Sequence, residues 1–151
     1  MNAMNELKQQ RVSSDNVAEI IAKDNPEKLV EVAQRVIQGR EQFTTSQIRN
    51  IFGPVRRIAL EWPQSLESDK DQEAAEKAYR QVVLLRPKLR YLAARDNKLR
   101  ELADILDAGI REIQEGSDLA EKKERFGRFV DFFEAILAYH TEKARESGRN
   151  E

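Results

Sequence analysis

Cysteine is absent from the 151-residue chain, and histidine occurs once, at His140. The lack of thiols excludes disulfides, thiolate zinc sites, iron–sulfur clusters and cysteine nucleophiles. A single imidazole also excludes histidine-rich metal centres and leaves a serine nucleophile with only one candidate base. The six glycines are scattered and form no GxGxxG or GxxxxGK phosphate loop. We therefore expect no enzyme activity, no cofactor and no metal site, and we interpret His140 as a buried or helix-end histidine.

Long apolar runs are also absent. No stretch approaches the roughly 18 apolar residues that a membrane span needs, and the N-terminal sequence MNAMNELKQQ has no apolar signal core. Charged residues make up 35% of the chain and hydrophobic residues 40%, but the hydrophobic residues recur at regular spacing. This pattern favours a folded, highly charged protein over disorder. We expect it to be cytoplasmic and to make no membrane contact.

Hydrophobic residues recur with the 3.6-residue period of an α-helix through most of the chain, and no strand pattern of useful length is present. The predicted fold is all-α, a compact antiparallel bundle of about five or six helices. It forms a single helical domain over residues 1–151, in which 1–14 and 146–151 are frayed and 63–72 form a surface loop. The last helix is predicted to bury one apolar face, made of Leu119, Phe126, Phe129, Val130, Phe133, Ile136 and Leu137.

Helix ends are marked by capping residues. Asn25 followed by Pro26 predicts a helix start, and Gly39 predicts its end. Thr44 with Gln47 three residues later is typical of a capping box. Gly116-Ser117-Asp118 predicts the end of one helix and the cap of the next. Two prolines lie inside predicted helices: Gly53-Pro54 is expected to kink or split its helix, and Pro87 is expected to bend another.

The net charge of −1 hides an uneven distribution of charge. Residues 1–34 carry 4 basic and 6 acidic groups, residues 35–100 carry 14 and 8, and residues 101–151 carry 8 and 13. A basic middle segment can bind a polyanion through its local potential. Matching of charges between helices explains the same distribution equally well. Helical carboxylate pairs, such as Asp104 with Asp107 and Asp131 with Glu134, are interpreted as solvated faces and not as metal ligands.

Two basic surfaces are candidates for nucleic-acid binding. Arg49 and Arg56 lie within about 20° of each other on one helix, opposite its apolar stripe, and Arg57 adjoins them. The alternative for this face is ion pairing with acids on a neighbouring helix. The second surface is the stretch LRPKLRYLAAR, residues 85–95, which contains no acid. Its cations are Arg86 and Arg90 on one side of the apolar stripe and Lys88 and Arg95 on the other.

Tyr91 falls between Lys88 and Arg95 in that stretch. Guanidinium groups bind phosphate oxygens bidentately, and an exposed tyrosine stacks on a base. This combination suits single-stranded nucleic acid bound without sequence reading. Packing of Tyr91 at a helix junction is at least as compatible with the sequence.

Three stretches together resemble a known family. TTSQIRNIF (residues 44–52), LRPKLRYLAAR (85–95) and FVDFFEAILAYH (129–140) are similar to the three best-marked stretches of the small subunit of type III-A CRISPR effector complexes, in the same order and in helical context. The resemblance covers roughly the last two-thirds of the chain. The first 40 residues and the 63–72 loop carry no matching motif, and Gly53-Pro54 departs from the family pattern.

The resemblance implies a non-catalytic, all-helical subunit. Several copies would line the filament of a ribonucleoprotein in which a guide RNA captures a target transcript, and each copy would contact target RNA, other type III-A effector subunits and further copies of itself. The implied role is antiviral defence. The residues expected to contact the RNA backbone are Arg49, Arg56, Arg57, Arg86, Lys88, Arg90 and Arg95. Of these, Arg56 and Arg57 rest on helix geometry alone.

Two other functions are compatible with the sequence. A helical protein–protein adaptor would use its arginines to match acidic neighbours and would make no contact with nucleic acid. A helix-turn-helix DNA regulator needs two helices joined by a turn of about three residues, and the Gly53-Pro54 break is its only candidate site.

Overall fold

The computed structural model describes residues 12–38 and 43–146. These residues form six α-helices and a short 3₁₀ helix, with no strand among them, which confirms the predicted all-α bundle. The helices are α2 (Ser14–Ile21), α3 (Pro26–Ile37), α4 (Thr45–Glu61), α5 (Asp69–Arg95), α6 (Arg100–Gln114) and α7 (Leu119–Glu146), and the 3₁₀ helix η1 (Asn97–Leu99) lies between α5 and α6.

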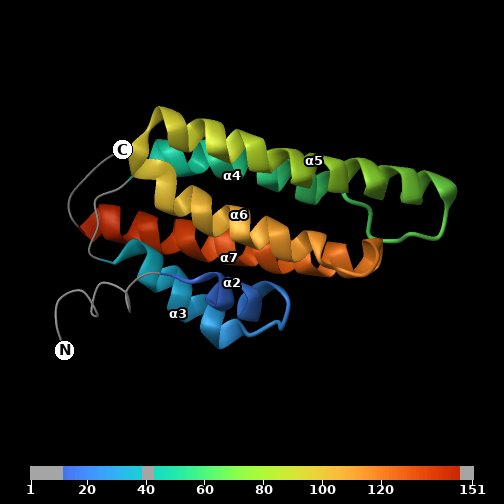
Figure 1. Ribbon diagram of the computed structural model, residues 1–151, viewed down its shortest axis with the longest axis horizontal. Coiled ribbons are helices and arrows are strands. Elements are labelled where there is room, and N and C mark those ends of the chain that lie inside the picture. The colour runs from blue at the N-terminus through green and yellow to red at the C-terminus, as the bar shows by residue number, and fades with distance from the viewer. Residues whose placement is uncertain (1–11, 39–42, 147–151) are drawn as a thin grey trace.

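The helices form three layers of two (Figure 1). The pair α4 and α5 forms one outer layer, the shorter pair α2 and α3 forms the other, and α6 and α7 lie between them. Helix α7 packs against all five other α-helices. The layer of α4 and α5 therefore has one face on the core, and its opposite face is open to solvent.

The centre of the core is a row of phenylalanines on α7. Phe129, Phe132 and Phe133 are fully buried, and the Phe133 ring lies 5.0 Å from the ring of Phe52 on α4. The predicted apolar face of α7 omitted Phe132. It is buried because α7 is the central helix and packs on several sides. Three of the predicted positions are only partly buried and border the core; they are Leu119, Val130 and Leu137.

Local capping sets where the helices begin. The Thr44 hydroxyl accepts from the Gln47 N–H at 3.1 Å, and the Gln47 side chain accepts from the Thr44 N–H at 2.9 Å, so the predicted capping box is present. Asn25 caps α3 as predicted. Asp118 accepts from the N–H of Glu121 in the first turn of α7, which confirms its capping role. The predicted helix end at Gly39 lies outside the described residues.

The two prolines do not interrupt their helices. Helix α4 runs unbroken through Gly53-Pro54, and α5 runs unbroken through Pro87. The prediction that α4 splits is wrong because apolar side chains before and after Pro54, including Ile51, Val55 and Ile58, are buried on one continuous face. With no turn at this position, the helix-turn-helix hypothesis loses its only candidate site.

Two predicted boundaries also shift. The predicted loop at 63–72 is shorter, because α5 begins at Asp69, where Ser68 accepts from the Asp71 N–H. At the N-terminal side, Ser13 and Asn16 form a capping box for α2, so the predicted fraying of residues 1–14 does not extend to this helix start. Residues 1–11 and 147–151 lie outside the described part of the chain.

Candidate nucleic-acid interface

Two hollows lie along the seam between α4 and α5. One, of about 530 Å³, is lined by Pro54, Arg57, Ile58 and Glu61 of α4 and by Ala74, Lys77, Ala78, Gln81, Leu84, Leu85 and Lys88 of α5. The other, of about 450 Å³, is lined by Gln47, Asn50 and Ile51 of α4, by Leu92 and Arg95 of α5 and by Asp96 and Leu99 beyond it. On each helix these residues repeat with the i, i+3, i+4 spacing of one helix face, so both hollows belong to one stripe per helix. We call the two hollows together the α4–α5 groove.

Cations dominate the rim of this groove. Arg57 and Lys88 line the first hollow, and Arg95 lines the second. These are three of the seven residues predicted to bind RNA. All three side chains are exposed, and none forms an ion pair within the described part of the chain. Because their charges are not neutralised by a protein carboxylate, they remain available to an external anion.

Lys77 is a further cation of the groove that sequence reasoning missed. It lines the first hollow together with Lys88. Lys77 lies eleven residues before Lys88, which is close to three helical turns and places both on the same side of α5. This spacing is the signal from which Lys77 could have been found, although it lies outside the basic stretch 85–95.

The acids of the groove are few. Glu61 lines the first hollow and Asp96 the second. Hydrogen bonds from the Lys98 N–H and from the Gln47 side chain lower the pKa of Asp96 below its ordinary value, so this carboxylate is held as an acceptor in its charged form. The Gln47 contact, at 2.7 Å, ties the start of α4 to the residue that follows α5.

Arg86 and Arg90 point away from the groove, toward α6. The Nε of Arg86 donates to Asp107 at 2.8 Å and its Nη1 donates to Gln114 at 2.8 Å. Arg90 donates to Asp104 at 2.8 Å. The sequence correctly placed these two arginines on the side of α5 opposite Lys88 and Arg95. It left charge matching between helices open but did not identify the acids of α6 as their partners.

Arg49 and Arg56 lie on the outer flank of α4, away from the groove. The Nη1 of Arg56 donates to Glu134 of α7 at 3.0 Å, and both side chains stay largely exposed. Arg49 is exposed and forms no ion pair within the described residues. The predicted basic face of α4 is therefore divided: Arg57 belongs to the groove, Arg56 is paired, and Arg49 stands alone.

The carboxylate pairs noted in the sequence take part in these contacts. Asp104 and Asp107 are the partners of Arg90 and Arg86, and Glu134 is the partner of Arg56. Burial and the neighbouring charge of Glu134 raise the pKa of Asp131 above its ordinary value. No group of three or more His, Asp or Glu side chains that could hold a metal ion occurs within residues 12–38 and 43–146.

Tyr91 is exposed, with 54% of its surface accessible; it does not line either hollow but lies on α5 between the groove residues Lys88 and Arg95. It is not packed at a helix junction. The guanidinium carbon of Arg95 lies 5.6 Å from the centre of the Tyr91 ring, and Arg95 Nη1 lies 3.5 Å from the tyrosine hydroxyl. The ring is thus held by a cation–π contact with a groove residue.

His140 is a packed residue, as interpreted from the sequence. Its ring stacks on Phe43 with centroids 5.0 Å apart, and its Nε2 lies 2.8 Å from the Phe43 carbonyl oxygen. This contact joins the last third of α7 to the residue before the α4 cap. His140 has a structural role at the end of the bundle.

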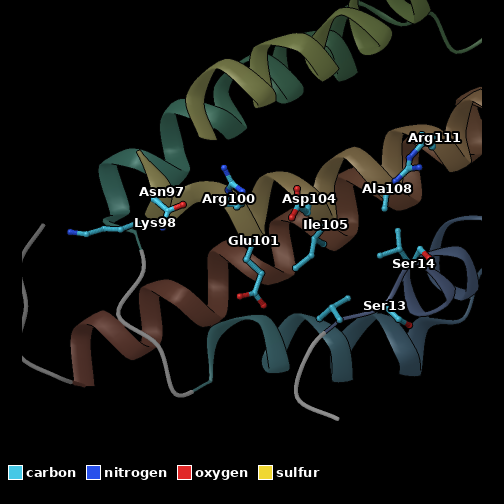
Figure 2. A pocket seen from close by; sticks show the side chains of 12 residues that line it. Ser13, Ser14, Asn97, Lys98, Arg100, Glu101, Asp104, Ile105, Ala108 and Arg111 are labelled. Carbon is cyan, nitrogen blue, oxygen red and sulfur yellow. The ribbon is translucent and has the colours of Figure 1, made fainter. Parts of the chain in front are cut away.

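A third hollow, of about 630 Å³, lies between α2 and α6 (Figure 2). Its lining mixes both charges: Lys98, Arg100 and Arg111 with Glu101 and Asp104. In Figure 2, Lys98 and Arg100 point away from the N-terminal helices, whereas Glu101 points toward them. Since acids nearly balance bases here, this hollow is less suited to a polyanion than the α4–α5 groove.

The fold and the groove define an all-α bundle with a cationic face on one outer layer. The family model for Csm2 Type III-A matches residues 23–146, so the chain belongs to this family and is a small subunit of the type III-A CRISPR complex. The family resemblance seen in the sequence is confirmed, and family membership implies assembly with other type III-A Csm subunits. No curated protein and no solved structure matches the chain. Within the described part of the chain, no helix combines the length and the apolar composition that a membrane span requires.

Proposed function

We propose that this subunit lines the filament of the cytoplasmic, RNA-guided complex and binds the phosphate backbone of target RNA without cleaving it. The observation that carries the proposal is the α4–α5 groove, where Arg57, Lys77, Lys88 and Arg95 line one seam without ion pairs among the described residues. Lysine and arginine that neutralise phosphates release condensed counterions, which supplies affinity independent of sequence.

The groove fits a strand better than a compact anion. Its stripe on α5 extends from Ala74 to Arg95, which spans about 32 Å at 1.5 Å per residue. A ligand that contacts both hollows must therefore be extended. Because guide–target pairing supplies sequence specificity, the subunit needs to recognise only phosphate and shape.

Of the seven residues predicted from the sequence, the proposal relies first on Arg57, Lys88 and Arg95, with Arg49 on the flank of the same helix. Arg56, Arg86 and Arg90 contribute less, because carboxylates at 2.8–3.0 Å already offset their charge. The affinity of one copy is expected to be weak. Self-association along the filament compensates, since linked copies act at high effective concentration.

The test is RNA binding by a charge-reversed groove. The variant Arg57→Glu/Lys88→Glu/Arg95→Glu should bind single-stranded RNA more weakly. Because it neutralises about three fewer phosphates, the slope of log K against log salt concentration should be less negative by about 2. The matched control Lys23→Glu/Lys70→Glu/Arg145→Glu makes the same change in net charge at exposed sites outside the groove. Equal RNA affinity of the two triple variants would refute the proposal.

The second candidate function is a protein–protein adaptor with no nucleic-acid contact. It is favoured by the ion pairs of Arg56, Arg86 and Arg90 and by the exposed leucines Leu60 (79%) and Leu84 (45%). An adaptor predicts that the groove variant fails to join the complex and that the assembled complex shows no crosslink between this subunit and RNA. An RNA-binding subunit predicts the opposite in both measurements.

A further inference from the structure

We propose that Tyr91, held by Arg95, is a stacking site for one unpaired nucleobase of the bound strand. The inference rests on the proposed function, because a base reaches Tyr91 only if the backbone follows the α4–α5 groove. It adds a contact to the base itself, which the phosphate contacts of Lys88 and Arg95 do not provide.

The position of Tyr91 on α5 supports this role. Lys88, one turn before it, and Arg95, one turn after it, fall with it inside an arc of about 60° around the helix axis. Both cations line the groove. A backbone that contacts Lys88 and Arg95 therefore passes alongside the tyrosine ring, so a base turned out from this backbone meets the ring.

The surroundings of the ring leave space for a base. Tyr91 is 54% accessible, and its neighbours along the helix surface, Pro87 four residues before and Ala94 three residues after, are small and exposed. Burying an exposed aromatic ring against a base is favourable for every base, because each one has a π face. The stacking site is therefore expected to bind without sequence preference.

Arg95 orients the ring at the edge of the groove. Its guanidinium lies 5.6 Å from the ring centre and its Nη1 lies 3.5 Å from the hydroxyl, while no carboxylate among the described residues pairs with it. The pair thus offers an aromatic face and a free positive charge side by side. A nucleotide with its base exposed offers the complementary aromatic face and negative charge. A base already paired and stacked in a duplex has no face free for the ring, so the site selects unpaired nucleotides.

The test compares oligoadenylate with an abasic ribose-phosphate strand of equal length, each bound to the full chain. The wild type should bind oligoadenylate more tightly, and Tyr91→Leu should lower its affinity for oligoadenylate at least about fivefold while leaving the abasic strand unaffected. Tyr91→Phe should retain the preference, since it keeps the ring. The control is Tyr79→Leu, which removes a ring on the same helix that also contacts a cation, Lys122 at 4.7 Å, but is partly buried against the core and lies opposite the groove.

Each other outcome has a defined meaning. Equal wild-type affinity for the two strands overturns the stacking site and leaves backbone binding intact. If Tyr91→Leu weakens binding of both strands equally, the stacking site is also ruled out, because the ring then contributes to binding of the backbone and not of a base. Absence of binding to either strand overturns the proposed function, and the stacking site with it.

Discussion

Gly109 lies where α6 packs against the central phenylalanine row of α7. A Cβ at this position would lie 2.8 Å from Cδ2 and 3.0 Å from Cε2 of Phe129, well inside the 3.5–4.0 Å of a normal carbon contact. The Phe129 ring is 1% exposed and lies between the rings of Phe126 and Phe133, with centroids 6.1 and 6.4 Å away. It has little freedom to move, so Gly109→Ala requires a shift of the two central helices.

The magnitude follows from two opposing effects. Replacing glycine by alanine inside a helix stabilises it by about 0.5–1 kcal/mol, whereas overpacking a core costs about 1–3 kcal/mol. Gly127, on the exposed side of α7, provides the matched control, because a Cβ there meets nothing within 4 Å. Gly127→Ala should raise the free energy of unfolding by about 0.5–1 kcal/mol. The free energy of unfolding of Gly109→Ala should be lower than that of Gly127→Ala by about 1–3 kcal/mol.

Urea denaturation monitored by circular dichroism measures both variants. For a chain of this size, about 1 kcal/mol corresponds to a shift of roughly 2–4 °C in Tm, so thermal unfolding provides an independent value. Both substitutions replace glycine by alanine inside a helix, so the gain in helix propensity is the same in each and drops out of the difference between their free energies of unfolding. Equal stability of Gly109→Ala and Gly127→Ala would refute the close packing of α6 on Phe129.

Two further predictions concern ion pairs and pH. Asp107→Ala removes the carboxylate bound to Arg86, and since the Asp107 side chain is 15% exposed, the free energy of unfolding should fall by about 1–3 kcal/mol in urea denaturation. Asp104→Ala, at a side chain 59% exposed, should lower the free energy of unfolding by only about 0–1 kcal/mol. An equal loss of stability in Asp104→Ala and Asp107→Ala would contradict the difference in burial between the two carboxylates. Hydrogen bonds from the Ser117 hydroxyl and N–H and from Arg125 lower the pKa of Glu121 from 4.5 to about 2, so its stabilising effect is present above pH 4.5 and is lost as the pH falls toward 2. A carboxyl NMR titration should find this low pKa, and Glu121→Gln should flatten the dependence of stability on pH between these values; an ordinary pKa would contradict the hydrogen-bonded geometry.

Much of the fold was predictable because its determinants are local. Capping residues such as Thr44 and Asp118 act within one turn, and the period of the apolar residues fixes which side of each helix is buried. Gly53-Pro54 misled the prediction of a split because the helix-breaking effect of proline is local, whereas the continuous buried face of α4 is a property of the whole bundle. The burial of Phe132 depends on α7 being central, which no single-helix pattern contains.

The candidate site was predictable in part for the same reason. Helix geometry separated Lys88 and Arg95 from Arg86 and Arg90, and the structure agrees. Whether an arginine is neutralised depends on which helix packs beside it, so the pairing of Arg86 with Asp107 required the tertiary arrangement. The groove itself could not be read from either helix alone, because it exists only where α4 and α5 lie together.

Ultraviolet crosslinking of the assembled type III-A complex on target RNA, with crosslinked peptides identified by mass spectrometry, tests the central claim most directly. RNA bound along the α4–α5 groove predicts crosslinks within residues 47–61 and 74–95, with Tyr91 among the crosslinked positions. Crosslinks confined to the α2–α3 layer, or an absence of RNA crosslinks to this subunit in an intact complex, would contradict it.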